Sequence, residues 1–124
     1  MILADADALI DWLRDKGLAD VVEQLLDRQE LATTAIGAYE LWSGAHTDAA
    51  RADVRGLLSL MTAIVPFDDQ AAELAGAARR ELAREGRVIG KVDTYVAGIC
   101  LAVGAPLLTR NRREFERVRG LRLV

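Results

Sequence analysis

Residues 2–13 of the chain read ILADADALIDWL and combine a strongly apolar segment with three aspartates. Residues 2–5 are predicted to form a short strand. Apolar residues then recur three and four positions apart, which is the spacing of an amphipathic helix. A strand that passes directly into a helix is typical of α/β proteins with a largely parallel sheet.

The three aspartates of this segment have different expected roles. Asp5 closes the predicted strand, where it is either a turn residue or a ligand at the edge of the sheet. Asp7 is well placed to cap the N-terminus of the first helix. Asp11 is expected to be a solvent-facing or dipole-favoured residue of that helix and not a ligand. Of the three, we therefore assign chemistry to Asp5 alone.

The rest of the chain alternates between short apolar runs and longer stretches of helical period. Further strands are predicted over residues 31–33, 63–66, 107–109 and 121–124. Helices are expected after Gly17, over about 35–44 with Thr34 as its cap, over 48–61, from Asp68 or Asp69 to Gly86, and over 91–103 before Gly104. The pattern predicts an α/β fold with a central, mostly parallel sheet of about five strands.

The composition excludes several classes of protein. With 124 residues, 52% of them hydrophobic, the chain is expected to form one folded domain over residues 1–124. No apolar run reaches the roughly 20 residues that cross a bilayer, and no signal peptide is recognisable, so we expect a cytoplasmic protein without membrane contacts. Cys100 and His46 are each the only residue of their type, which excludes an internal disulfide and a His/Cys zinc site.

The net charge of −3 hides an uneven distribution. Residues 1–78 carry 14 Asp or Glu and 5 Lys or Arg, a net charge of −9, whereas residues 79–124 carry 5 and 11, a net charge of +6. A basic surface beside an acidic one suits the binding of an RNA backbone. Solvated faces and contacts with a protein partner explain the arginines about as well.

Four oxygen-bearing side chains are expected to meet at one edge of the sheet, because ligands of parallel sheets bind beyond the carboxyl ends of the strands. They are Asp5, Glu40, Asp93 and Asn111. A buried carboxylate without a partner costs several kcal/mol, so the group requires a counter-charge or a metal ion. Mg²⁺ and Mn²⁺ prefer such oxygen ligands and bind beside phosphates, which favours phosphodiester hydrolysis.

Three segments, ILADADALIDWL, TTAIGAYELWSGA and GKVDTYVAGICLAVGAPLLTRNRREFERVRGLRLV, resemble successive blocks of PIN-domain proteins. The resemblance is to the VapC-type toxins of bacterial or archaeal toxin–antitoxin pairs and runs from Ile2 to Val124. It implies a three-layer α/β/α fold and an endoribonuclease that uses Mg²⁺ or Mn²⁺. It also implies an RNA substrate of the tRNA or rRNA class, a cognate antitoxin and a homodimer.

Carried over by position, the acids of the family fall on Asp5, Glu40 and Asp93, which are expected to be catalytic. The same three residues, with Asn111, are expected to bind the metal ion. Two neighbouring residues are expected to support these ligands: Thr109 and Glu114. Three cations are expected to contact RNA: Arg110, Arg112 and Lys91.

Several positions depart from the family pattern or allow two interpretations. Asn111 stands where many relatives have aspartate, and it is almost equally well placed to cap a helix. Glu114 is either a supporting acid or an exposed helix charge. Lys91 and Tyr95 replace smaller or apolar residues, and Lys91 can pair with Asp93 or contact a phosphate. The alternative function is a catalytically weak PIN-fold module that binds RNA or a protein.

Overall fold

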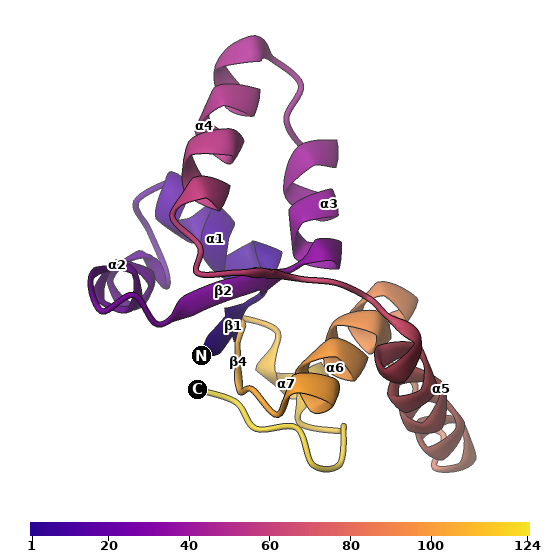
Figure 1. Cartoon of the computed structure of the whole chain (residues 1–124). Coiled ribbons are helices and arrows are strands. Elements are labelled where there is room, and N and C mark those ends of the chain that lie inside the picture. Colours follow the sequence, from indigo (N-terminus) through magenta and orange to yellow (C-terminus); the bar gives the residue numbers. More distant parts are fainter.

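Four parallel strands form the central sheet of the computed structural model, which describes residues 1–124 (Figure 1). The strands are β1 (Ile2–Ala4), β2 (Leu31–Thr34), β3 (Ile64–Val65) and β4 (Leu107–Leu108), in the order β3-β2-β1-β4. β1 lies in the middle, with Leu3 beside Ala32 on one side and Leu107 on the other. Because all the pairs are parallel, the carboxyl ends of the strands meet at one edge, as predicted.

The fifth predicted strand, residues 121–124, is reduced to a single bridge, so the expectation of about five strands is corrected to four. Leu123 lies beside Leu107 in parallel orientation. Leu107 donates its N–H to the Arg122 carbonyl at 2.9 Å and accepts the N–H of Val124 at 3.0 Å. β4 is only two residues long. Its free edge is therefore too short for residues 121–124 to pair with it beyond this bridge.

Helices cover both faces of the sheet, which gives the predicted three-layer α/β/α arrangement (Figure 1). One face carries α1 (Ala6–Leu13), α2 (Ala19–Asp27), α3 (Ala35–Ser43) and α4 (Asp48–Ser59). The other face carries α5 (Asp69–Arg84), α6 (Lys91–Val103) and α7 (Arg112–Phe115). Neighbouring strand residues point to opposite faces, so Leu3 packs with the second group of helices and Ala4 with the first. None of these helices has the length and apolar character needed to cross a bilayer.

Several predicted helix ends are confirmed by their local geometry. Thr34 caps α3 by accepting a backbone N–H of its first turn at 2.8 Å, and Asp68 caps α5 in the same way at 2.9 Å. α6 ends at Gly104, whose φ of 67° lies in the left-handed region that favours glycine. The start of α3 and the end of α6 are thereby defined, and these are the helices that carry Glu40 and Asp93.

The first helix begins two residues earlier than predicted, so the assignment of Asp7 as its cap was wrong. Asp5 is the N-cap: its backbone is extended, and its Oδ1 accepts the N–H of Ala6 at 2.9 Å. Since β1 ends at Ala4, Asp5 is the single residue between strand and helix. Asp7 lies in the first turn of α1.

Asp11 is buried, with 1% of its surface exposed, although it was expected to face solvent. The chain turns back after α1 through Gly17, and Asp11 Oδ2 accepts the N–H of Leu18 at 3.0 Å. The same oxygen lies 3.2 Å from Nε of Arg110. A Cβ on Gly17 would lie only 2.2 Å from this oxygen. Asp11 therefore ties α1 to the start of α2 and to the loop after β4.

α5 and α6 pack unusually closely through small residues. A Cβ on Gly98 of α6 would lie 2.5 Å from the Ala71 carbonyl oxygen and 2.6 Å from Ala75 Cβ, both on α5. A backbone atom and a Cβ cannot move aside as a long side chain can. Gly98 therefore sets the distance between the two helices and, with it, the position of the first turn of α6.

We predict that Gly98→Ala destabilises the protein by about 1–3 kcal/mol, because the added methyl group overpacks the α5–α6 contact. Gly56→Ala is the matched control, since a Cβ at this position of α4 meets no atom within 4 Å. The control is expected to gain up to about 1 kcal/mol from helix propensity. Urea unfolding followed by circular dichroism measures both changes, and an equal gain in the two variants would contradict this account.

We predict that Arg110→Ala costs about 2 kcal/mol of unfolding free energy, because it leaves the buried Asp11 carboxylate without its cation while the arginine itself is half exposed. Asp11→Asn keeps an acceptor for the N–H of Leu18 and removes the charge. In the double variant, the loss of Arg110 is therefore expected to cost much less. Additive losses in a double-mutant cycle would show that the ion pair contributes nothing.

Candidate metal centre at the carboxyl edge of the sheet

Five carboxylates lie together where the strands end. They form what we call the acidic cluster: Asp5, Asp7, Glu40, Asp93 and Glu114. The first two come from the junction of β1 and α1, the third from α3, the fourth from the first turn of α6 and the fifth from α7. Each of the three acids singled out from the sequence is close enough to another member for electrostatic repulsion between them.

Asp5 is the most deeply placed member of the cluster, with 6% of its surface exposed. Its Oδ1 accepts the N–H of Ala6 at 2.9 Å, and its Oδ2 accepts the Thr109 hydroxyl at 3.0 Å. Burial, followed by repulsion from Asp7 and Asp93, raises the pKa of Asp5 to about 7 in spite of these hydrogen bonds. An ionised Asp5 therefore requires a positive partner in the site.

Asp7 belongs to the site, although it was predicted only as a helix cap. Its Oδ1 accepts the N–H of Arg110 at 3.1 Å, and its Oδ2 lies 3.3 Å from the Thr109 hydroxyl. A hydroxyl has one hydrogen, so Thr109 shares it between Asp5 and Asp7. A signal was present in the sequence: once Asp5 is taken as the cap, the next acid falls in the first helical turn, beside the same edge of the sheet.

Glu40 reaches the cluster from α3, next to the exposed Tyr39. Burial, followed by repulsion from Asp93 and Asp7, raises the pKa of the half-buried Glu40 carboxyl. It therefore keeps a proton to higher pH than an ordinary glutamate. A partly exposed carboxyl of this kind can exchange protons with water in the site.

Asp93 and Glu114 are joined by the side chain of Asn111. Its Nδ2 donates to Asp93 at 3.0 Å and to Glu114 at 3.2 Å. Burial, followed by repulsion from Glu114, raises the pKa of Asp93, and the hydrogen bond from Asn111 opposes this rise. Glu114 is therefore half-buried beside another acid, and it is not a freely exposed helix charge.

Asn111 is the N-cap residue of α7, as one of its two interpretations predicts, but its side chain makes no capping hydrogen bond. The carboxamide is directed to the acidic cluster and presents its nitrogen as a donor to two carboxylates. The role of its oxygen as a metal ligand stays a prediction.

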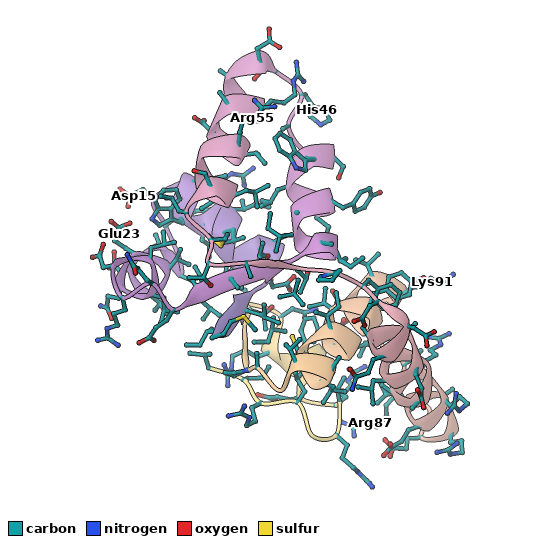
Figure 2. The ribbon with its side chains drawn as sticks, viewed as in Figure 1. Asp15, Glu23, His46, Arg55, Arg87 and Lys91 are labelled. Carbon is teal, nitrogen blue, oxygen red and sulfur yellow. The ribbon has the colours of Figure 1, made fainter.

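The three cations expected to contact RNA lie in different settings. Lys91 begins α6, is exposed and forms no ion pair with Asp93 (Figure 2). Arg110 pairs with Asp11, and Arg112 donates to the carbonyl oxygen of the C-terminal residue. Of the three, only Lys91 retains a charge that is not engaged by the protein.

Nucleophilic catalysis by the lone thiol is excluded. Cys100 is 1% exposed, and burial, followed by repulsion from Asp5, raises its pKa to about 12. Because the thiolate is the reactive form, Cys100 is inert at neutral pH. His46 lies in the connection between α3 and α4, at the far end of that helix pair from the sheet (Figure 2).

The donor set fits a hard divalent cation that keeps much of its own water. No three Asp, Glu, His or Cys side chains form a ready-made set of metal ligands. Mg²⁺ usually binds through one or two carboxylates and retains several waters, so an open acidic cluster is sufficient. None of the ion pairs in the structure involves a carboxylate of the acidic cluster, so no lysine or arginine side chain neutralises the cluster at close range.

Comparison with known proteins agrees with this geometry. The sequence profile of the PIN domain matches residues 2–121. The tRNA(fMet)-specific endonuclease VapC of Shigella flexneri is 35% identical over 125 residues, which covers 97% of this chain and 93% of the relative. Ribonuclease VapC2 of Haemophilus influenzae is 31% identical over 97 residues, covering 75% and 73% of the two chains.

Solved structures of similar proteins share the whole fold. DNA-bound VapBC from Salmonella typhimurium matches with a TM-score of 0.86 and 29% identity, covering 100% of this chain and 98% of the other. VapBC-1 from nontypeable Haemophilus influenzae matches with a TM-score of 0.84 and 26% identity, covering 100% and 97%. The chain therefore belongs to the PIN-domain family, and within it to the VapC type.

Proposed function

We propose that this protein is the endoribonuclease toxin of a toxin–antitoxin pair and that it hydrolyses RNA with a divalent cation held by the acidic cluster. The observation that carries the proposal is a group of five carboxylates at the carboxyl edge of a parallel sheet, none of which forms an ion pair with a lysine or arginine. Relatives that are named as ribonucleases support it. A catalytically weak binding module has less support, because binding alone does not require so costly a cluster.

In this proposal Asp5, Asp93 and Glu40 hold the cation, with Asn111 as a further candidate through its oxygen. When bound, Mg²⁺ or Mn²⁺ supplies Lewis-acid activation of the scissile phosphate. Thr109 orients Asp5 by donating its hydroxyl hydrogen, and Asn111 holds Asp93 beside Glu114. Glu40, whose pKa is raised, is suited to accept a proton from the attacking water and to return it to solvent.

The names of the relatives support a substrate class and a partner for this protein. Because the Shigella relative is named as a tRNA-specific endonuclease, we infer that tRNA is the first substrate class to test, with rRNA as the second. The Salmonella and Haemophilus structures are VapBC complexes, so we infer a cognate antitoxin and a cytoplasmic setting for the pair. Trp42 lies on α3 and Leu60 directly follows α4, and both are exposed. They supply apolar surface for contacts with an antitoxin or a second copy of this chain.

We predict that Asp5→Ala, Glu40→Gln and Asp93→Asn each lower the rate of RNA cleavage at least about 100-fold. Removing a residue that only hydrogen-bonds to a metal ligand already lowers metal affinity or activity by about 10- to 100-fold, and loss of a ligand itself is expected to cost at least as much. The assay incubates tRNA with antitoxin-free protein and Mg²⁺ or Mn²⁺ and resolves the products by electrophoresis. EDTA is expected to abolish cleavage by the wild type.

Asp27→Asn is the matched control for this assay, because Asp27 is an exposed acid at the end of α2. It is expected to cleave at the rate of the wild type. Undiminished cleavage by Asp5→Ala, or cleavage that persists in EDTA, would refute the proposed mechanism. Absence of cleavage with both tRNA and rRNA, from folded protein supplied with metal, would favour the binding module.

We predict that Asp5 makes the metal-free protein less stable as the pH rises. Between the ordinary pKa of 3.8 and the value of about 7 in the fold, the native state keeps a proton that the unfolded chain has lost. The free energy of unfolding therefore falls across this range, by an amount of the order of 4 kcal/mol relative to Asp5→Asn. The two proteins should have similar stability at pH 4, and the variant should be the more stable above pH 7.

Thermal or urea unfolding in EDTA measures this difference. The same measurement with Mg²⁺ in place of EDTA tests whether the cation stabilises the native state through Asp5. Because a cation that binds only the native state stabilises it, Mg²⁺ should raise the stability of the wild type more than that of Asp5→Asn. Equal stability of the two proteins at both pH values would contradict the burial of an uncompensated carboxyl at position 5.

A further inference from the structure

A second feature of α6 lies on the side opposite the acidic cluster. A pocket of about 360 Å³ opens between α5 and the first turns of α6. Small residues of α5 form one wall, and the larger lining side chains are Phe67, Arg79, Lys91, Thr94 and Tyr95. No acidic residue lines it.

The aromatic part of the pocket is a pair of neighbouring rings that are tilted relative to each other. Phe67 and Tyr95 lie with ring centroids 5.0 Å apart at an interplanar angle of 40°. Both side chains are only partly buried, so the pair leaves aromatic surface open to the pocket. Such surface accepts the face of a nucleobase without regard to its identity, because every base has a π-face.

The charged part of the pocket consists of Arg79 and Lys91, which lie on adjacent helices. Both are exposed, and neither forms an ion pair or a side-chain hydrogen bond within the chain. Two free cations beside aromatic rings, with no carboxylate in the pocket lining, complement a ligand that has both a flat apolar part and negative charge. A nucleotide has this combination.

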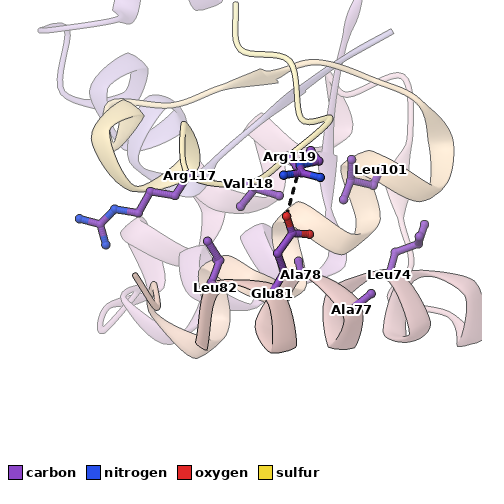
Figure 3. Close-up of a pocket in the computed structure, with 9 residues that line it drawn as sticks. All are labelled: Leu74, Ala77, Ala78, Glu81, Leu82, Leu101, Arg117, Val118 and Arg119. Atoms are coloured by element: carbon purple, nitrogen blue, oxygen red, sulfur yellow. Dashed lines mark ion pairs between the residues drawn. The ribbon is translucent and has the colours of Figure 1, made fainter. Parts of the chain in front are cut away.

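The neighbouring cavity provides an internal comparison. It measures about 310 Å³ and lies between α5, Leu101 of α6 and the segment after α7 (Figure 3). Its Arg119 is paired with Glu81 at 3.2 Å, so this charge is already compensated (Figure 3). The cavity also lacks an aromatic side chain. Of the two cavities, only the pocket at the start of α6 has both free charge and aromatic surface.

The position of the pocket connects it to the acidic cluster. Lys91 and Asp93 share the first turn of α6 but leave the helix on different sides, since residues two apart do not face each other. The close contact at Gly98 fixes α6 against α5. A strand of RNA with its scissile phosphate at Asp93 therefore needs to pass only across the N-terminus of α6 to enter the pocket.

We propose that this pocket binds one nucleotide of the RNA substrate beside the cleavage site, with the base on Tyr95 and the adjacent phosphates at Lys91 and Arg79. The proposal rests on the proposed ribonuclease function and adds a substrate subsite to it. Arg79 and Tyr95 thereby become determinants of substrate affinity that lie outside the acidic cluster.

The test measures binding of a short, fluorescein-labelled single-stranded RNA of mixed sequence by anisotropy, in EDTA so that no cleavage occurs. Tyr95→Leu is expected to weaken binding roughly 10-fold through lost stacking, and Tyr95→Phe to restore it. Lys91→Gln and Arg79→Gln should each weaken binding. Each should also reduce the magnitude of the slope of log K against log [salt] by about one, because one phosphate contact is lost. Arg84→Gln, the same charge change in the last turn of α5, is the matched control.

The outcomes separate this proposal from the function on which it rests. If the wild type cleaves RNA but Tyr95→Leu, Lys91→Gln and Arg79→Gln bind and cleave like Arg84→Gln, the subsite is refuted and the ribonuclease function stands. If the wild type does not cleave, the function fails, whereas the anisotropy still reports on the pocket. A changed oligomeric state with unchanged RNA affinity, in sedimentation of the pocket variants, would identify the pocket as a protein interface and also overturn the proposal.

Discussion

The buried carboxylate of Asp5 is the constraint on which the rest of the site depends. It ends the central strand and caps the helix that follows, so its backbone position is set by the fold itself. Its neighbours include other carboxylates. Burial, followed by repulsion from them, raises its pKa to about 7, so the ionised form of Asp5 is unfavourable in the fold. A bound divalent cation would remove that cost, because it would supply the positive charge that no lysine or arginine side chain provides there.

The parallel topology explains how distant segments reach this point. β1 pairs with β2 and β4, so the turns after all three strands open at the same edge, and Thr109 can bond to Asp5 across 104 positions of sequence. Further contacts keep the supports in place: the Asp11–Arg110 pair anchors the loop after β4, and Gly98 holds α6 against α5. The same first turn of α6 then presents Asp93 to the cluster and Lys91 to the neighbouring pocket.

The sequence predicts those features that depend on local pattern or on strand ends. Helix caps at Thr34 and Asp68 and the convergence of Asp5, Glu40 and Asp93 at one edge were of this kind. Features that depend on tertiary contacts were not predictable. Asp11 looked solvent-facing because its partners, the turn at Gly17 and an arginine almost a hundred residues away, become neighbours only in the fold. Residues 121–124 have the composition of a strand, but the short β4 leaves them a single bridge.

The central claim is that the acidic cluster is a binding site for a divalent cation. The most direct measurement is the anomalous diffraction of crystals of the antitoxin-free protein soaked in Mn²⁺, compared with crystals of Asp5→Asn treated in the same way. The account predicts an anomalous peak among the carboxylates of Asp5, Glu40 and Asp93 in the wild type and a weaker peak, or none, in the variant. No peak at this edge of the sheet, or a peak only elsewhere on the molecule, would contradict it.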